Sequence, residues 1–230
     1  MNWDNWQNWL EVDDKTTELY QKAGNINEIN IPEKYLSLWK EISMPVQKQK
    51  ALNYDLSKEE TEKCFEQLSK RPYYLVSLAE NFGVKNIAEV GTAEGLQYYS
   101  FAEYVSNNDG HVWSCDLRDV RNETCKERYE DVTTFCLGDS AKLSSTLDEK
   151  IDLFYIDASH QRNMVLQDVD NMKKHQSENP LWVFDDFDTR FGCYYDIQEI
   201  CKLAKRFKIY KVGNAASGNP NHQVIVYGKL

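Results

Sequence analysis

From about residue 71 onward, short apolar runs alternate with amphipathic segments of helical length. The apolar runs span 86–90, 111–117, 133–139, 151–158 and 181–187. The segments between them carry apolar residues at helical spacing, for example Val165, Val169 and Met172. Near-continuous apolar strands that alternate with helices are typical of a parallel sheet covered on both faces. The pattern therefore predicts a doubly wound α/β domain.

The last two apolar runs are connected differently. Residues 207–213 and 222–228 are both β-type, but only eight residues, NAASGNPN, join them. A connection this short cannot contain a crossover helix, so we expect an antiparallel hairpin. With this hairpin the sheet should have seven strands, mostly parallel, in a Rossmann-like arrangement. The domain would span 71–230, after a helical extension over 1–70.

The extension begins with regularly spaced tryptophans. Trp3, Trp6 and Trp9 would place three indole rings along one side of a short helix. Ser57 opens an S-x-x-E capping box, which predicts a further helix from about residue 58. Large apolar side chains are usually buried, so we expect the tryptophans to pack on the catalytic domain or on a second subunit, as in a homo-oligomer. The alternative is that they line an aromatic substrate pocket.

Charge and cysteine content narrow the kind of partner and the location. The chain has 27 Lys and Arg against 37 Asp and Glu, a formal net charge of −10. An acidic field opposes binding to phosphate backbones and anionic membranes, so we expect a small-molecule partner, with no nucleic acid and no membrane. The first thirty residues have early acidic residues and no apolar run of seven or more, so we expect no secretory signal there, and no apolar run is long enough to span a bilayer. The six cysteines lack C-x-x-C spacing, which favours reduced core thiols in a cytoplasmic protein.

A glycine-containing turn follows the first strand of the domain. The residues from Glu89 to Gly95 read E-V-G-T-A-E-G, with glycine at 91 and 95. Glycines at such a place let the backbone turn sharply from strand to helix and approach a ligand at the carboxyl edge of the sheet. Alone, this spacing is also that of an ordinary tight turn.

Polar residues at the next two strand ends strengthen the interpretation of a ligand site. Asp116 ends the second strand, where a carboxylate can accept hydrogen bonds from two ribose hydroxyls. Asp139 and Ser140 follow the third strand. The carboxyl ends of parallel strands lie along one edge of a sheet, so these residues should face a common ligand.

These motifs resemble those of the class I S-adenosylmethionine-dependent methyltransferases, over about residues 71–230. The resemblance implies that Gly91 and Gly95 border the methionine end of the cofactor, that Asp116 binds its ribose, and that Asp139 or Ser140 contacts adenine. It also implies a cofactor-binding role for Glu89, Thr92 and Asp157. A nicotinamide dehydrogenase fits less well, because its G-x-G-x-x-G turn would need glycine where the chain has Ala93.

A second set of acidic residues follows the fourth and fifth strands. Asp157 and His160 form a D-x-x-H motif after the fourth strand, and Asp185 and Asp186 end the fifth. Neighbouring strand ends converge, so the three carboxylates can meet around one Mg²⁺, which prefers oxygen ligands. Such a metal would hold and acidify a substrate hydroxyl. His160 could then act as the general base that removes its proton.

This second set resembles the metal-dependent O-methyltransferases, particularly those of macrolide sugars and more distantly the catechol type. The resemblance implies Asp157, Asp185 and Asp186 as Mg²⁺ ligands and His160 as the catalytic base. The chain departs from that pattern after the histidine, where it reads Q-R-N, and before the fifth strand, where it reads E-N-P instead of P-G-G. Alternatively, Asp157 contacts only the cofactor, His160 has a structural role, and Asp185 or Asp186 caps the next helix.

The function predicted from the sequence is therefore methyl transfer from S-adenosylmethionine to a hydroxyl oxygen of a small molecule, assisted by Mg²⁺. Two alternatives stay open. One is a metal-independent methyltransferase that acts on nitrogen or carbon. The other is a non-catalytic domain that binds the cofactor or a partner.

Overall fold

A computed structural model describes residues 10–11, 24–25, 41–46, 48–49, 57, 59, 71–214 and 220–230. The helices are α3 (Arg71–Asn81), α4 (Leu96–Ser106), α5 (Glu123–Arg128), α6 (Ser140–Thr146), α7 (Met164–Met172) and α8 (Cys193–Leu203). The long strands are β3 (Asn86–Val90), β4 (His111–Asp116), β5 (Thr133–Leu137), β6 (Ile151–Ile156), β7 (Gln176–Phe184), β8 (Arg206–Asn214) and β9 (Pro220–Tyr227). Two-residue strands β1 (Leu10–Glu11) and β2 (Gly24–Asn25) and short 3₁₀ turns at Glu130–Val132 and Lys173–His175 complete the described elements.

The sheet order confirms the predicted fold class. The strands lie side by side as β8-β9-β7-β6-β3-β4-β5, and the neighbours from β7 to β5 are parallel. β8 and β9 form the expected antiparallel hairpin, with β9 inserted against β7. The edge strand β8 also pairs with the short strands β1 and β2. β6 and β7 are direct neighbours, so the two acidic motifs that follow them lie at one edge of the sheet.

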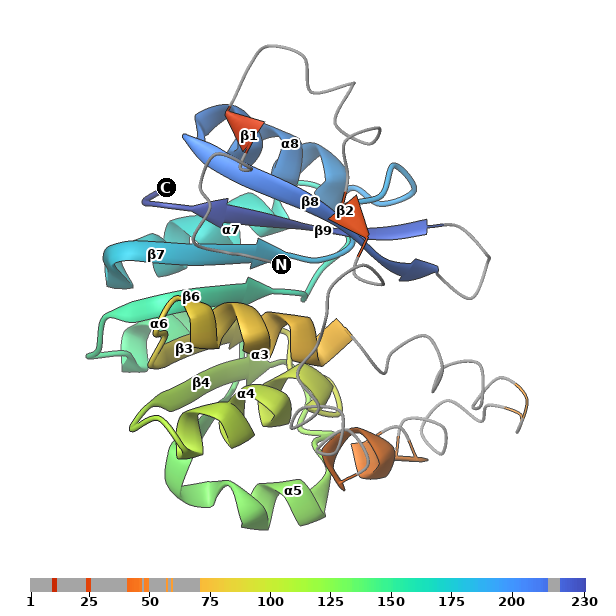
Figure 1. Ribbon diagram of the computed structural model, residues 1–230, viewed down its shortest axis with the longest axis vertical. Coiled ribbons are helices and arrows are strands. Elements are labelled where there is room, and N and C mark those ends of the chain that lie inside the picture. Colours follow the sequence, from red (N-terminus) through yellow and green to blue (C-terminus); the bar gives the residue numbers. More distant parts are fainter. Residues whose placement is uncertain are drawn as a thin grey trace.

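Helices cover both faces of the sheet, and each face has its own apolar core (Figure 1). α3, α4 and α5 pack on one face, and α6, α7 and α8 pack on the other. Side chains of a strand alternate between the two faces. In β6, Leu153 and Tyr155 join the α3/α4 core, whereas Phe154 and Ile156 join the α7/α8 core. This alternation explains why β6 is apolar without interruption toward its carboxyl end.

The element boundaries follow the local sequence signals closely. α3 ends before Gly83, whose φ of 62° gives the left-handed conformation that commonly closes a helix. β7 begins at Gln176, five residues before the predicted start at 181, because the polar residues at its amino end still belong to the strand. Asn122 caps α5 by accepting a hydrogen bond from the amide of Cys125. α5 and α6 are short, and helical periodicity gave no signal for either of them.

The expectations for the first 70 residues are mostly outside the described part. The tryptophan stripe and the helix after Ser57, except for Glu59, which is helical, fall on residues that the structure does not describe. Their packing on the domain and the boundary near residue 71 stay predictions. Residues 41–46 are helical, with Ile42 and Val46 buried. Five of the six cysteines are described, and all five are buried free thiols. None of the helices in the described ranges is long and apolar enough to cross a membrane.

Candidate active site

The glycine turn after β3 has the backbone conformation that a close approach requires. Gly91, Ala93 and Gly95 have φ values of 96°, 45° and 93°, all in the left-handed region. A Cβ atom at Gly91 would lie 2.2 Å from the carbonyl oxygen of Asp157, so no other residue fits without a shift of the backbone. The turn therefore lies directly against the start of the loop that follows β6.

A buried hydrogen-bond network supports this turn from beneath. Ser114 donates its hydroxyl proton to Glu89 over 2.6 Å, and the Ser114 and Thr92 hydroxyl oxygens are 2.5 Å apart. Ser114 has only one hydroxyl proton to give, so Thr92 is the donor between them. Glu89 is 1% exposed, and this burial raises its pKa to about 8, opposed by the Ser114 hydrogen bond and reinforced by the charges of Asp157 and Asp116.

Asp116 stands at the end of β4 and fixes the same turn. Its carboxylate accepts a hydrogen bond from the amide of Ala93 over 2.8 Å and another from the amide of Arg118 over 3.1 Å. The left-handed conformation of Ala93 costs about 1–2 kcal/mol in an L-residue, and this hydrogen bond helps to offset it. Asp116 is half-buried at the strand end, which leaves it accessible to a ligand.

Asp139 and Ser140 make contacts within the protein. Asp139 is the N-cap of α6 and accepts a hydrogen bond from the amide of Lys142 over 2.9 Å. Ser140 is buried and donates to Asp168 over 2.6 Å. Neither residue lines the pocket described below, so their predicted contact with adenine stays a prediction.

The acidic motifs after β6 and β7 bring three potential metal ligands together. One ligand atom each from Asp157, His160 and Asp186 lies within 4.8 Å of the other two. His160 Nε2 is 2.6 Å from Asp186 Oδ2, and this hydrogen bond raises the pKa of His160. Partial burial opposes that shift, and the charges of Asp186 and Asp157 add to it. The ring of Phe191 lies beside the imidazole, with 4.4 Å between ring centroids.

Asp185 is placed differently from the ligand set predicted from the sequence. It is 3% exposed, and its two carboxylate oxygens lie 2.9 Å from the Tyr155 hydroxyl and 2.8 Å from the amide of Asp186. Within the described ranges, the group with metal-binding spacing contains His160 in place of Asp185. Asp186, where the backbone is left-handed with a φ of 53°, pairs instead with His160.

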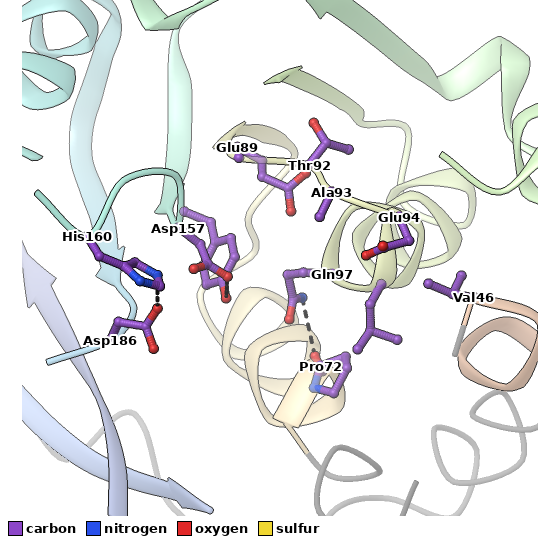
Figure 2. A pocket seen from close by; sticks show the side chains of 13 residues that line it. Val46, Pro72, Glu89, Thr92, Ala93, Glu94, Gln97, Asp157, His160 and Asp186 are labelled. Carbon is purple, nitrogen blue, oxygen red and sulfur yellow. Dashed lines mark hydrogen bonds and ion pairs between the residues drawn. The ribbon is translucent and has the colours of Figure 1, made fainter. Parts of the chain in front are cut away.

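Residues from each of the two sets line one pocket of about 300 Å³. Its lining includes Glu89, Gly91, Thr92, Asp157, His160 and Asp186, and Figure 2 shows Asp157 between the glycine turn and the His160–Asp186 pair. Val46, Pro72 and Gln97 close the side opposite His160 (Figure 2). The pocket thus brings part of the predicted cofactor set together with His160 and Asp186. The other predicted site residues do not line it: Gly95, Asp116, Asp139, Ser140 and Asp185.

The sequence analysis missed two polar groups of this site. Ser114 pairs with Glu89 in the register of β3 and β4, and a serine within an otherwise apolar strand was the available signal. Tyr155 lines the pocket from β6, two residues before Asp157 and therefore on the same face of the strand. A tyrosine in a buried run is usually counted as core, which hides its hydroxyl.

Comparison with known proteins identifies the class. Residues 88–187 match a family described as a methyltransferase domain. Among solved structures, an O-methyltransferase from Bacillus cereus in complex with SAH covers 89% of this chain and 95% of its own, with TM-score 0.61 and 17% identity. No curated protein matches the sequence.

Two further structures have the same fold and different acceptors in their names. The N-methyltransferase NodS from Bradyrhizobium japonicum, in complex with S-adenosyl-L-homocysteine, covers 69% of this chain and 85% of its own, with TM-score 0.54 and 15% identity. An rRNA methylase from Streptococcus thermophilus covers 69% and 95%, with TM-score 0.53 and 15% identity. The chain thus contains a stretch that matches a methyltransferase domain and has the fold of these methyltransferase structures, and the fold does not specify its acceptor.

Proposed function

We propose that this chain transfers a methyl group from S-adenosylmethionine to a hydroxyl oxygen of a small molecule, with Mg²⁺ bound beside the acceptor. The observation that carries the proposal is the shared pocket, in which the glycine turn at Gly91 lies across from Asp157, His160 and Asp186. The first set suits the cofactor, and the second suits the deprotonation of a hydroxyl. The O-methyltransferase from Bacillus cereus supports the choice of oxygen as acceptor.

The donor set fits a hard divalent cation. Asp157 and Asp186 offer carboxylate oxygens, His160 offers a ring nitrogen, and the pocket leaves room for water or substrate oxygens. Asp157 and Asp186 are the ligands that we infer, and the His160 imidazole beside them faces the acceptor. Mg²⁺, when bound, would supply the positive charge that lowers the pKa of an acceptor hydroxyl.

His160 is the residue that we propose as the general base. A base must be within hydrogen-bond reach of the proton it takes, and His160, whose side chain is 51% exposed, lines the pocket. Its hydrogen bond to Asp186 fixes the imidazole orientation, and Phe191 limits the rotation of the ring. The protein otherwise has to hold the acceptor oxygen in line with the labile methyl group.

Calorimetry and thermal unfolding test the two parts separately, with S-adenosylhomocysteine and MgCl₂ as probes. S-adenosylhomocysteine should bind, and MgCl₂ at a hundred times its Kd should stabilise the protein by about 2.7 kcal/mol through linkage. Asp186→Asn should reduce the response to MgCl₂. Asp170→Asn is the matched control and should keep the full response to MgCl₂. Asp170 lies on α7 in an exposed ion pair with Lys173.

Two outcomes would contradict the proposal. NAD binding without S-adenosylhomocysteine binding would reject the cofactor. If EDTA changed neither the melting temperature nor methyl transfer, the metal would be rejected, and the metal-independent alternative would take its place.

A further inference from the structure

A continuous chain of buried polar side chains runs from α3 to the acidic residues of the site. The Tyr74 hydroxyl donates a hydrogen bond to Oε1 of Gln223 on β9. Gln223 Nε2 donates to the Tyr155 hydroxyl oxygen over 3.4 Å. Tyr74 and Gln223 are fully buried, and Tyr155 is 2% exposed. Buried polar groups cost free energy unless they are hydrogen-bonded, so this chain through an apolar core calls for an explanation.

This series of hydrogen bonds has a direction, because each donor determines the orientation of the next donor. Gln223 accepts from Tyr74 with its carbonyl oxygen, so its amino group faces Tyr155. The Tyr155 oxygen accepts this hydrogen bond, and its single proton is left for the carboxylates on its other side. The protons of the chain therefore all point toward the active site.

Tyr155 contacts one carboxylate of the proposed metal group, that of Asp157, and the neighbouring carboxylate of Asp185. Its hydroxyl oxygen is 3.0 Å from Asp157 Oδ2 and 2.9 Å from Asp185 Oδ2. The other oxygen of Asp185 accepts the amide of Asp186 over 2.8 Å. Tyr155 thus contacts Asp157 directly and is linked to Asp186 through Asp185.

Packing alone does not account for the hydroxyl. The Tyr155 ring contacts Phe101 edge to face, with 6.2 Å between centroids, as a phenylalanine ring could also do. A phenylalanine would also spare the cost of burying the hydroxyl and the amide of Gln223. The part of the side chain that tyrosine adds is the part that touches the acidic residues.

We propose that Tyr155 is a positioning residue, whose hydroxyl, oriented by Gln223 and Tyr74, holds Asp157 and Asp185 and thereby sets the carboxylate spacing around one divalent cation. This inference rests on the proposed function, because it assumes a cation at Asp157 and Asp186. It gives Asp185 the role of a link between Tyr155 and the backbone of Asp186. Residues that orient metal ligands commonly change metal affinity 10–100-fold when they are replaced.

The test compares Tyr155→Phe with Tyr104→Phe in the full chain. Tyr104 is also a buried tyrosine whose hydroxyl has two acceptors, the carbonyl oxygens of Ala79 and Val84, but it lies in α4 away from the pocket. Calorimetry with MgCl₂ should show an affinity about 10- to 100-fold weaker in Tyr155→Phe and unchanged in Tyr104→Phe. S-adenosylhomocysteine affinity should stay at the wild-type value in both variants, and turnover should fall only in Tyr155→Phe.

A second variant keeps the test informative if Tyr155→Phe does not fold. Tyr74→Phe leaves Tyr155 in place but removes the donor that orients Gln223, so it should weaken MgCl₂ binding in the same direction by a smaller factor. Wild-type MgCl₂ affinity in Tyr155→Phe, or in Tyr74→Phe if that is the variant that folds, would overturn the positioning role while leaving the proposed function intact. A wild-type protein that binds S-adenosylhomocysteine but no MgCl₂ would reject the metal itself, and the positioning role with it.

Discussion

The polar groups at the carboxyl ends of β3 and β4 and those at the carboxyl ends of β6 and β7 are held in different ways. At β3 and β4, the backbone does most of the positioning: Gly91 and Gly95 are left-handed, and Asp116 accepts two main-chain amides. At β6 and β7, side chains hold one another, as His160 does with Asp186.

Because of this difference, substitutions at the ends of β3 and β4 should have other effects than substitutions at the ends of β6 and β7. A site fixed by main-chain conformation depends on a few residues that no other type can replace. A site fixed by mutual hydrogen bonds between charged groups depends on the state of each partner, including its protonation and any bound cation. We therefore expect substitutions in the first half to affect stability and cofactor affinity, and those in the second to affect chemistry.

The largest expected effect comes from the half built by charged side chains. His160→Ala should lower turnover about 10²- to 10⁴-fold, the usual contribution of a positioned general base. S-adenosylhomocysteine affinity should be unchanged, because the imidazole contacts none of the groups that fix the glycine turn. Transfer of a labelled methyl group to a hydroxylated acceptor on which the wild type is active, together with calorimetry, measures the two quantities.

His175→Ala is the matched control for this prediction. His175 ends the 3₁₀ turn that follows α7 and does not line the pocket. Its Nε2 is hydrogen-bonded to Ser144, so removal of the imidazole should leave turnover unchanged. Equal turnover in His160→Ala and the wild type would show that the acceptor is not deprotonated by this histidine.

A methyl group added at Gly91 should disrupt the glycine turn after β3. The clash with the Asp157 carbonyl costs about 1–3 kcal/mol as overpacking, and the left-handed φ adds about 1–2 kcal/mol. Gly91→Ala should therefore lower the free energy of unfolding by about 2–5 kcal/mol, measured by urea titration.

Gly83→Ala provides the comparison for this change. Gly83 is also left-handed, with φ 62°, but nothing lies within 4 Å of a Cβ at this position. Its cost should be limited to about 1–2 kcal/mol of backbone strain. If both substitutions cost the same, the contact between the turn and the β6 loop would not be as close as the structure has it.

The contrast between the two pairs of strand ends also explains which parts of the site could be predicted from the sequence. Gly91 and Asp116 were predictable because strand ends and the need for glycine are local properties of the chain. The membership of the acidic group was not, because Asp185 and Asp186 are adjacent in sequence and differ only in their partners in the fold, Tyr155 for Asp185 and His160 for Asp186. Tyr155 was missed since two of its three hydrogen-bond partners, Asp185 and Gln223, lie far from it in the sequence.

Asp116→Ala tests the cofactor side with a smaller expected effect. A ribose diol left without its acceptor costs about 1–3 kcal/mol, which corresponds to S-adenosylhomocysteine binding about 5- to 150-fold more weakly in calorimetry. Asp119→Ala, three residues further on, removes a carboxylate that pairs with Arg121 instead and should leave the affinity unchanged. If Asp119→Ala weakened S-adenosylhomocysteine binding to the same extent, the effect of Asp116→Ala would come from the loss of a negative charge and not from a specific contact.

The last prediction concerns the buried Glu89 and the gradual change of the free energy of unfolding with pH. Its pKa in the folded protein is about 8, against an ordinary value of 4.5, mainly because burial disfavours the charged form. Between these two values the folded state holds a proton that the unfolded state has lost, so wild-type stability should fall as the pH rises. The slope is at most about 1.4 kcal/mol per pH unit and should level off above pH 8.

Glu89→Gln isolates this contribution, because glutamine stays neutral and keeps an acceptor for the Ser114 hydroxyl. The difference in unfolding free energy between Glu89→Gln and the wild type should therefore shift in favour of the variant from pH 5 to pH 8. Glu123→Gln, at a side chain that is 80% exposed, should leave the pH dependence of the wild type unchanged. A constant difference between Glu89→Gln and the wild type across this range would mean that Glu89 is already ionised in the folded protein. In that case the network of Ser114 and Thr92, and not burial, would dominate the environment of this carboxyl group.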